Sequence, residues 1–242
     1  MKVIILAAGK GTRLHSEEAN IPKALREVCG KPLLRYVLDN IAFIPEEDIY
    51  IVVGYKKEMI LRAFRGQYHF VEQEEQLGTG HAVMMAEPFL RDYQGDVMVL
   101  YGDMPLVSTT TLRNIMDAHQ KTSSRCTLLT AVVENPPDYG RIIRDEKGDI
   151  MDIVEVKDCT PEQLAIPEVN VGVQLFDAQT LFEGLKLLKN DNKQKEYYLT
   201  GVPKILMEKG IKVNSFVTRD ADEILGVNTL EDMKMCEAVL SR

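Results

Sequence analysis

The chain has 242 residues, of which 45% are hydrophobic and 27% are charged, an ordinary globular composition with enough length for a full core. Its net charge of −8 argues against a nucleic-acid partner, because surfaces that bind duplexes carry a basic excess. No apolar stretch approaches ~18 residues, which argues against a membrane span.

The cysteine pattern indicates the cellular compartment, and the lack of domain boundaries in the sequence indicates the number of domains. Four scattered cysteines without a C-x-x-C pair are typical of reduced thiols, so we expect a cytoplasmic protein. No linker, charge block, low-complexity tract or fixed-period repeat divides the sequence. We therefore predict one domain over residues 1–242.

Apolar runs alternate with segments of helical periodicity through the first half of the chain. The expected strands there are 3–7, 49–54, 70–73 and 97–100, and the expected helices are 33–41, 56–64, 79–86 and 108–119. This alternation is typical of an α/β fold with a parallel, doubly wound sheet.

The second half is richer in expected strands. These are 126–133, 140–144, 150–156 and 169–176, followed by helices 178–188, 199–209 and 230–240. Consecutive strands favour an antiparallel portion, so the whole is predicted to be a mostly parallel mixed sheet flanked by helices. Thr229 with Asp232 three residues later resembles a capping box at the start of the last helix.

Several polar or glycine-rich segments directly follow expected strands. Residues 9–13, Gly54 and residues 102–103 come after three different strands. In sheets of this class, ligands bind beyond the carboxyl ends of the strands. The sequence therefore predicts that these segments share one edge and form a ligand site.

The first of these segments reads Gly-Lys-Gly-Thr-Arg and matches no standard nucleotide motif. The dinucleotide pattern would need glycine where Leu14 stands, and the P-loop pattern is absent. The amides of Gly9 and Gly11 could still hold phosphate oxygens, and the guanidinium of Arg13 matches phosphate. The same residues would also suit a plain strand–helix turn with an exposed arginine.

The other segments offer groups that complement a nucleotide. The amides of Gln73 and Gln76 can both donate and accept, as reading a base edge requires. Asp103, after a buried strand and a glycine, is placed to hold Mg²⁺. Each has a plainer interpretation as a capped loop or a turn, and we expect His81 to begin a helix without a catalytic role.

Together these segments resemble the sugar-1-phosphate nucleotidyltransferases. The resemblance runs from residue 3 to about 230 and rests on these stretches, in order: LAAGKGTRL (residues 6–14), Pro22-Lys23, QLGTGHA (76–82), YGDMPL (101–106), DYGRIIRD, IVEVKDCTPEQ, EVNVG, EYYLTG and GVNT. The chain is most similar to the uridylyltransferase domains of N-acetylglucosamine-1-phosphate uridylyltransferases. This implies a Rossmann-like nucleotidyltransferase fold with a more strand-rich sugar-binding second half.

The resemblance also implies a division of the chain and a set of roles. Residues 1–125 would mainly bind nucleotide, residues 126–228 would mainly bind sugar phosphate, and residues 229–242 would form a C-terminal helix. The catalytic residues would be Arg13, Lys23 and Asp103, and Asp103 with Asn228 would hold Mg²⁺. The nucleotide-binding residues would be Leu6, Ala7, Ala8, Gly9, Gly11, Thr12, Gln73, Gln76, Gly78 and Thr79. The sugar-phosphate-binding residues would be Tyr101, Gly102, Gly140, Glu155, Asn170, Tyr198 and Thr200.

The implied reaction is transfer of a uridylyl group from UTP to N-acetylglucosamine-1-phosphate. A phosphate nucleophile is already an anion near neutral pH, so catalysis would rest on alignment and charge neutralisation. Val171 and Gly201 depart from the family pattern and bear on the sugar preference. Another sugar-1-phosphate or nucleotide (glucose-1-phosphate, dTTP, CTP) and a non-catalytic nucleotide-sugar-binding module stay as alternatives.

The bifunctional relatives continue into a β-helix acetyltransferase domain. No hexapeptide repeats occur in this chain, so we expect no acetyl transfer. Because those relatives assemble through that domain, we expect a monomer or a weak homo-oligomer.

Overall fold

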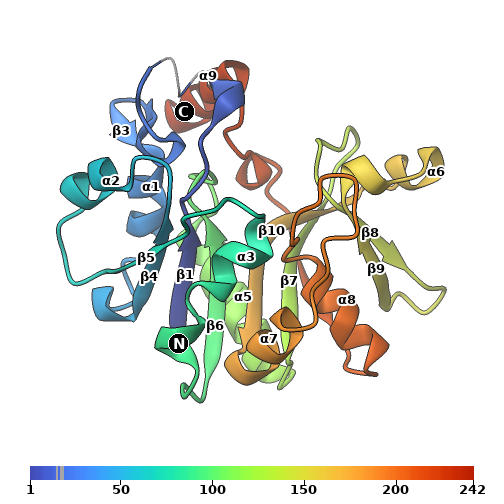
Figure 1. The fold of residues 1–242 in the computed structure, drawn as a ribbon. Helices are drawn as coiled ribbons and strands as arrows, with labels where there is room; N and C mark the ends of the chain where they lie inside the picture. The colour runs from blue at the N-terminus through green and yellow to red at the C-terminus, as the bar shows by residue number, and fades with distance from the viewer. Residues whose placement is uncertain (15, 17–18) are drawn as a thin grey trace.

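One mixed sheet runs through the molecule in the computed structural model, which describes residues 1–14, 16 and 19–242 (Figure 1). Within these residues the sheet has nine strands, and seven lie in the order β11-β7-β10-β6-β1-β4-β5. Its strands are β1 (Lys2–Leu6), β4 (Ile49–Val53), β5 (His69–Glu72), β6 (Asp96–Tyr101), β7 (Cys126–Val132), β8 (Arg141–Arg144), β9 (Ile150–Val154), β10 (Glu168–Asp177) and β11 (Asn214–Thr218). A separate small ribbon pairs β2 (Glu27–Val28) with β3 (Lys31–Pro32).

Strand direction divides the sheet as the sequence predicted. β1 pairs in parallel with both β4 and β6, and β4 pairs in parallel with β5. The long strand β10 is antiparallel to its neighbours β6 and β7, and the β8–β9 hairpin joins it at one end. The α/β class, the mixed and mostly parallel sheet and the strand-rich second half are therefore confirmed.

Helices cover both faces, because the strand side chains alternate between two cores. Val3 and Ile5 of β1 face one core and Ile4 the other. The helices are α1 (Leu33–Asn40), α2 (Lys57–Ala63), α3 (Thr79–Met84), α4 (Glu87–Leu90), α5 (Thr109–Lys121), α6 (Pro161–Leu164), α7 (Ala178–Leu185), α8 (Gly201–Glu208) and α9 (Leu230–Leu240). Residues of α1, α2 and α5 pack in the first core, and residues of α3, α4, α7 and α8 pack in the second.

Several expected boundaries differ by one to three residues from the observed ones, and three of the described strands (β2, β3 and β11) were missed. The helix expected over 199–209 runs from Gly201 to Glu208, and the amide of Leu199 in the preceding turn donates to Thr79 Oγ1, 2.9 Å away. The helix expected over 178–188 ends at Leu185. Strand β11 has only two adjacent apolar residues and no alternation, so its conformation comes from pairing with β7 at the sheet edge.

The strand order places a topological switch at β1. The chain goes from β1 to β4 and β5 on one side, and then crosses to β6 on the other. Leu6, the last residue of β1, lies level with Val52 and Tyr101 in the neighbouring strands, so the carboxyl ends of all three strands share one edge. The loops beyond them carry Gly54 and Asp103, as predicted. Among the described residues, no helix combines the length and apolar character needed to cross a bilayer.

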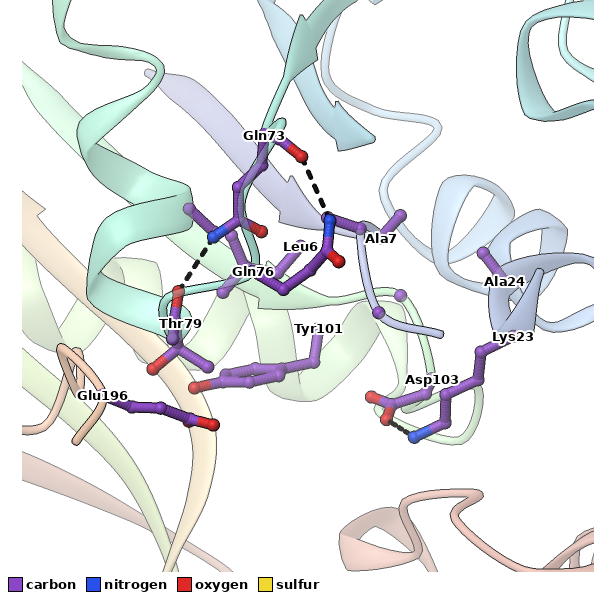
Figure 2. Close-up of a pocket in the computed structure, with 15 residues that line it drawn as sticks. Leu6, Ala7, Lys23, Ala24, Gln73, Gln76, Thr79, Tyr101, Asp103 and Glu196 are labelled. Atoms are coloured by element: carbon purple, nitrogen blue, oxygen red, sulfur yellow. Dashed lines mark hydrogen bonds and ion pairs between the residues drawn. The ribbon is translucent and has the colours of Figure 1, made fainter. Parts of the chain in front are cut away.

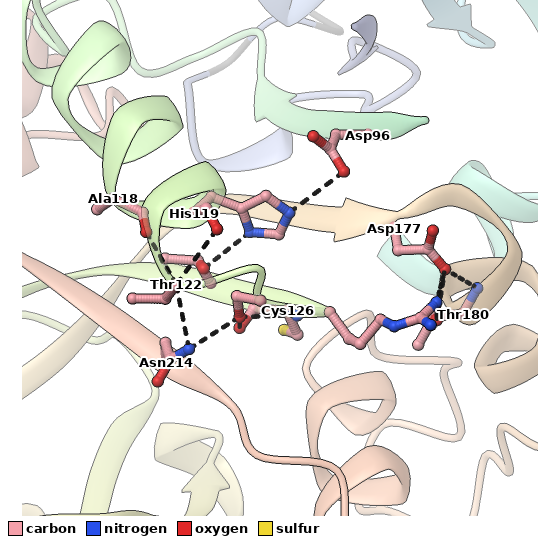
Figure 3. A network of polar contacts seen from close by, with 11 residues as sticks. Asp96, Ala118, His119, Thr122, Cys126, Asp177, Thr180 and Asn214 are labelled. Carbon is pink, nitrogen blue, oxygen red and sulfur yellow. Dashed lines mark hydrogen bonds and ion pairs between the residues drawn. The ribbon is translucent and has the colours of Figure 1, made fainter. Parts of the chain in front are cut away.

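At the opposite edge of the sheet, a buried histidine ties α5 to the strands (Figure 3). His119 on α5 is 1% exposed, and its Nδ1 lies 2.8 Å from Thr127 Oγ1 on β7. Its Nε2 lies 3.4 Å from a carboxylate oxygen of Asp96 at the start of β6. The bond to Thr127 thereby joins α5 to β7, and Nε2, which has no hydrogen-bond partner among the described residues, faces Asp96 of β6.

Replacement of His119 by alanine should lower the free energy of unfolding by about 2–4 kcal/mol, since it leaves a cavity and an unpaired Thr127 hydroxyl. Urea unfolding measures the change. The control is Gln120→Ala on the exposed face of the same helix, for which we expect a change within about 0.5 kcal/mol. Equal stability of the two variants would contradict this role of His119.

Candidate active site

Two cavities open at the carboxyl edge of the sheet and meet. The first, which we call the Gln73 cavity, measures about 290 Å³ and lies above the ends of β1 and β6 (Figure 2). The second, the Asn170 cavity, measures about 250 Å³ and lies beside β10. Four residues line both cavities: Thr79, Tyr101, Asp103 and Glu196. The two cavities are therefore compartments of one cleft.

The wall of the Gln73 cavity includes one position, Gly78, where a side chain would not fit. Gly78 has φ +111°, and a Cβ there would lie 2.6 Å from the carbonyl oxygen of Tyr197. This close approach lets Tyr197 donate its amide to Leu77 O and accept from Gly80 N at 2.7 Å. The loop before α3 is thereby clamped to the segment before α8, although more than a hundred residues separate them.

The two glutamines use their amide nitrogens to hold this loop. Gln73, which is 3% exposed, donates from Nε2 to the carbonyl of Gly78 at 3.1 Å, and the same nitrogen lies 3.1 Å from His81 Nδ1. Gln76 donates from Nε2 to the carbonyl of Gln73 at 3.2 Å. No hydrogen bond to either amide oxygen occurs within the described part of the chain, so these oxygens can accept from a ligand. His81 orients Gln73 and does more than begin a helix.

The Asn170 cavity brings together a carboxylate, an amide and a phenol. Asn170 accepts from the amide of Gly172 through Oδ1 at 3.2 Å, and no residue that the structure describes accepts from its side-chain NH₂. Tyr198 donates its hydroxyl to Gln194 Oε1 at 2.8 Å, and burial raises the pKa of this phenol to about 12. The amide of Asn170 is therefore a neutral donor beside the carboxylate of Glu155, whereas the hydroxyl hydrogen of Tyr198 is already bonded to Gln194.

Glu155 is positioned by a residue that does not line the cavity. Thr200, which is buried, donates its hydroxyl to Glu155 Oε1 at 2.7 Å. Burial raises the pKa of Glu155, the hydrogen bond from Thr200 lowers it, and the charges of Asp158 and Glu196 raise it further. The net effect is a raised pKa, so the ionised carboxylate is held in the cavity at a cost in stability.

Replacement of Glu155 by glutamine should therefore stabilise the protein near pH 7 and have little effect near pH 4. The folded pKa lies above the ordinary value of 4.5, so the wild type loses stability as pH rises from that value through the raised pKa. Glutamine does not ionise, and the difference between the two proteins grows over the same window. Urea unfolding across this pH range measures it, with Glu134→Gln, an exposed position, as the control. A pH-independent difference would contradict the assignment.

Four polar side chains meet where the cavities join. Lys23 Nζ contacts a carboxylate oxygen of Asp103 and lies 2.8 Å from Asn228 Oδ1. Arg13 donates from Nη2 to the same Asn228 oxygen at 3.2 Å. These residues are separated by up to 215 positions in the sequence. The fold thus gathers two cationic groups and two acceptor oxygens at one point.

The loop that carries Asn228 is fixed from both sides. Val227 donates its amide to the carbonyl of Asp103 at 2.9 Å, which joins this loop to the one after β6. Asp232 accepts from the amides of Asn228 and Thr229 at 2.8 Å each, and its own amide donates to Thr229 Oγ1. The predicted capping box is confirmed, and it also sets the position of Asn228.

The acceptor oxygens of Asp103 and Asn228 suit a hard divalent cation. Carboxylate and amide oxygens are the ligands that Mg²⁺ takes, and here both converge on one cation, the Lys23 ammonium. The described residues contain no group of three or more His, Cys, Asp or Glu side chains arranged for a metal. Asp103 and Asn228 could supply two ligands to such an ion, and waters or phosphates the rest.

Most of the residues predicted for the site lie on the two cavities. Those lining the Gln73 cavity are Leu6, Ala7, Ala8, Gly9, Lys23, Gln73, Gln76, Gly78, Thr79, Tyr101, Gly102 and Asp103. Those lining the Asn170 cavity are Arg13, Thr79, Tyr101, Asp103, Gly140, Glu155, Asn170, Tyr198 and Asn228. Gly11, Thr12 and Thr200 line neither.

These three residues lie behind or beside the walls. Gly11 packs on Lys23, because a Cβ at Gly11 would lie 2.8 Å from the Cβ of Lys23. Thr12 is exposed in the turn after β1. Sequence reasoning also missed Glu196, which lines both cavities, and Asp138 and Tyr139, which line the second. Glu196 stands inside the EYYLTG motif, and Asp138 and Tyr139 are the first two residues of the DYGRIIRD motif, so the motifs could have pointed to all three.

Comparison with known proteins decides the family. Residues 2–224 match the family model described as nucleotidyl transferase. The chain belongs to the nucleotidyl transferase family. The resemblance inferred from the motifs is confirmed at this level, and the chain is a nucleotidyltransferase.

Two curated relatives of this nucleotidyltransferase are about twice as long as the chain. The chain is 44% identical over 239 residues to the bifunctional protein GlmU of Streptococcus gordonii, covering 99% of the chain and 51% of that protein. It is also 44% identical over 238 residues to the bifunctional protein GlmU of Clostridium novyi, covering 98% and 51%. The chain spans about half the length of the curated relatives it matches.

Solved structures of lower identity share the nucleotidyltransferase fold. The crystal structure of UDP-glucose pyrophosphorylase complexed with UDP-glucose gives a TM-score of 0.77 at 21% identity, covering 99% of this chain and 98% of that one. A Bacillus anthracis protein assigned as a glucose-1-phosphate thymidylyltransferase gives 0.79 at 19% identity, covering 99% and 94%. These similarities confirm the Rossmann-like nucleotidyltransferase fold.

Proposed function

We propose that the chain transfers the uridylyl group of UTP to N-acetylglucosamine-1-phosphate, giving UDP-N-acetylglucosamine and pyrophosphate. An oxygen of the sugar phosphate attacks the α-phosphorus of UTP, and a new P–O bond forms there. The bond from the α-phosphorus to the oxygen of the β-phosphate breaks, and pyrophosphate leaves with that oxygen. The observation that carries the proposal is that the two cavities join at Asp103, beside Lys23 and Arg13.

The side-chain oxygens of the two glutamines favour recognition of a nucleotide base that carries a ring N–H. Gln73 and Gln76 use their amide nitrogens within the protein, so they face a ligand as acceptors. Uracil presents the N3–H donor that such an acceptor needs, whereas the corresponding ring nitrogen of cytosine has no hydrogen. Thymine presents the same edge as uracil, which makes dTTP the sharpest competitor.

The polar groups of the second cavity support an N-acetylated sugar. The carboxylate of Glu155 can accept from the N–H of an acetamido group or from a hydroxyl, and the free NH₂ of Asn170 can donate to a sugar oxygen. Glucose-1-phosphate lacks the acetamido group but keeps the hydroxyls, so it is the competing sugar. Val171 and Gly201 depart from the family pattern next to these residues.

The cationic side chains support phosphoryl-group chemistry without a general base. Lys23 borders the Gln73 cavity and Arg13 the Asn170 cavity, so phosphates at the junction would lie between them. Both would neutralise the charge that develops as pyrophosphate leaves. When bound by Asp103 and Asn228, Mg²⁺ would supply further charge neutralisation to the phosphate oxygens. The metal, the substrates and a cytoplasmic location are all parts of this proposal.

A matrix assay of pyrophosphate release tests it. Purified protein is given UTP, dTTP, CTP or ATP in combination with N-acetylglucosamine-1-phosphate, glucose-1-phosphate or mannose-1-phosphate. We expect the highest kcat/KM for UTP with N-acetylglucosamine-1-phosphate. A preference for dTTP or CTP would overturn the uridylyl assignment, and a preference for glucose-1-phosphate would overturn the sugar. Binding of UDP-N-acetylglucosamine without pyrophosphate release from any pair would indicate a non-catalytic module.

A further inference from the structure

We propose that Lys23 acts as an internal cation that keeps divalent metal off Asp103 and Asn228 until the phosphates of a nucleotide draw it away. Metal and triphosphate would then bind in a coupled manner, each favouring the other. The inference rests on the proposed function in one respect, the phosphate groups that would draw Lys23 away. The competition between Lys23 and a metal ion for the same oxygens involves only side chains of this chain.

The contacts at the cavity junction carry the argument. Lys23 Nζ contacts one carboxylate oxygen of Asp103 and donates to Asn228 Oδ1 at 2.8 Å. The guanidinium of Arg13 donates to the same amide oxygen at 3.2 Å. One carboxylate oxygen of Asp103 therefore already accepts from a cationic donor, and Asn228 Oδ1 accepts from two such donors.

A lysine ammonium and a divalent ion cannot share these oxygens. Mg²⁺ binds its oxygen ligands at about 2.1 Å and demands a regular octahedron, so it would take the space beside the oxygens that Lys23 Nζ fills. The Lys23 ammonium and the metal ion would also repel each other if both contacted these oxygens. This repulsion is stronger in a partly buried site, where water screens charge less. The side chains of Lys23 and Asp103 are 15% and 22% exposed.

Lys23 has a route to a nucleotide without moving its backbone. It starts the short helical turn Lys23–Leu25, after Pro22, and Gly11 packs against its Cβ. Its side chain borders the Gln73 cavity, whereas Asn228 and Arg13 border the Asn170 cavity. Rotation of the side chain alone would turn Nζ from the metal ligands toward phosphates in the Gln73 cavity, where opposite charge would hold it.

Coupling of this kind must be reciprocal. If phosphate binding removes Lys23 from Asp103 and Asn228, metal affinity rises, and metal binding must raise nucleotide affinity by the same factor. A nucleotide-free enzyme would then bind metal weakly even though its ligands are preassembled.

Binding of Mn²⁺ to the nucleotide-free protein tests the inference without any turnover. Electron paramagnetic resonance of free Mn²⁺ is measured for the wild type and for Lys23→Met, which keeps the length of the side chain and removes its charge. We expect the variant to bind one Mn²⁺ at least ~10-fold more tightly, within the usual range of coupling between two sites. Adding Asp103→Asn to the variant should abolish the gain. The matched control is Lys2→Met, which removes a lysine paired with Asp48 at the other sheet edge.

A second measurement follows Lys23 in the wild-type protein, with a conservative variant used only to assign its resonance. Lysine side chains are labelled with ¹³C at Cε, and the Lys23 resonance is assigned by its loss in Lys23→Arg. We expect UTP to shift this resonance when a chelator has removed all divalent metal. In a separate titration without chelator, we expect UTP to lower the Mg²⁺ concentration at which the metal shifts the resonance. Unchanged Mn²⁺ affinity in Lys23→Met, or a Lys23 resonance that neither ligand moves, would overturn the inference. A different nucleotide preference in the matrix assay would overturn the proposed function and leave the Mn²⁺ result standing.

Discussion

Replacement of Asp103 by alanine should lower kcat at least ~100-fold, the scale seen when one preorganised group that stabilises transition-state charge is lost. Asp103 lines both cavities and contacts Lys23 at their junction. The change removes a proposed metal ligand and also frees Lys23 from its partner. Because one of the two proposed protein ligands remains in Asn228, the Mg²⁺ concentration needed for half-maximal rate should rise as well. Steady-state pyrophosphate release as a function of Mg²⁺ measures both effects.

The control for this variant comes from a similar ion pair at the other edge of the sheet. Asp48 pairs with Lys2, just as Asp103 pairs with Lys23, but lies at the amino-terminal ends of the strands. Asp48→Ala should leave kcat unchanged while removing one carboxylate–lysine pair. If Asp103→Ala turned over at the wild-type rate in a protein that unfolds at the wild-type urea concentration, Asp103 would have no part in metal binding.

Replacement of Lys23 by methionine should lower kcat/KM for UTP by a similar factor of at least ~100, since a fixed positive charge near the leaving phosphates would be lost. The same variant should bind Mn²⁺ more tightly without nucleotide. These two effects have opposite sign, and general damage to the site would lower both metal affinity and turnover. Steady-state kinetics and metal binding on one preparation therefore separate a specific loss of charge from misfolding.

Lys2→Met serves as the control here too, because Lys2 lies at the start of β1 and away from both cavities. It should reproduce the wild-type kcat/KM within about twofold, as expected of a surface change far from the chemistry. A kcat/KM for Lys23→Met within tenfold of the wild type would show that Arg13 alone suffices to neutralise the phosphates.

Local sequence patterns were enough to predict where the parallel strands end and several of the residues that follow them. Alternating apolar runs give the strands, and a glycine or aspartate that follows a strand must lie at its carboxyl end. This reasoning places Gly9, Gly54 and Asp103 on one edge, and the register of β1 with β4 and β6 confirms it. The capping box of Thr229 and Asp232 could likewise be predicted, because its hydrogen bonds span only three residues.

The tertiary structure alone decided which distant groups meet. Lys23 lies 80 positions from Asp103 and 205 from Asn228, and their contacts depend on how the loops after β1 and β6 pack against the loop before α9. The hydrophobic periodicity of the sequence contains no information about how these loops pack. For the same reason, the sequence suggested that Thr200 approaches a substrate, whereas in the fold its hydroxyl faces Glu155.

The sequence by itself thus determined the class of the sheet, the end of its strands where the candidate site lies and the chemical groups available there. These follow from residue type and from spacings of a few positions, which local backbone geometry translates directly into structure. Only the tertiary structure decided that one lysine ammonium shares its two acceptor oxygens with the proposed metal site. That outcome depends on distances between loops far apart in the chain, and packing of the whole domain sets those distances.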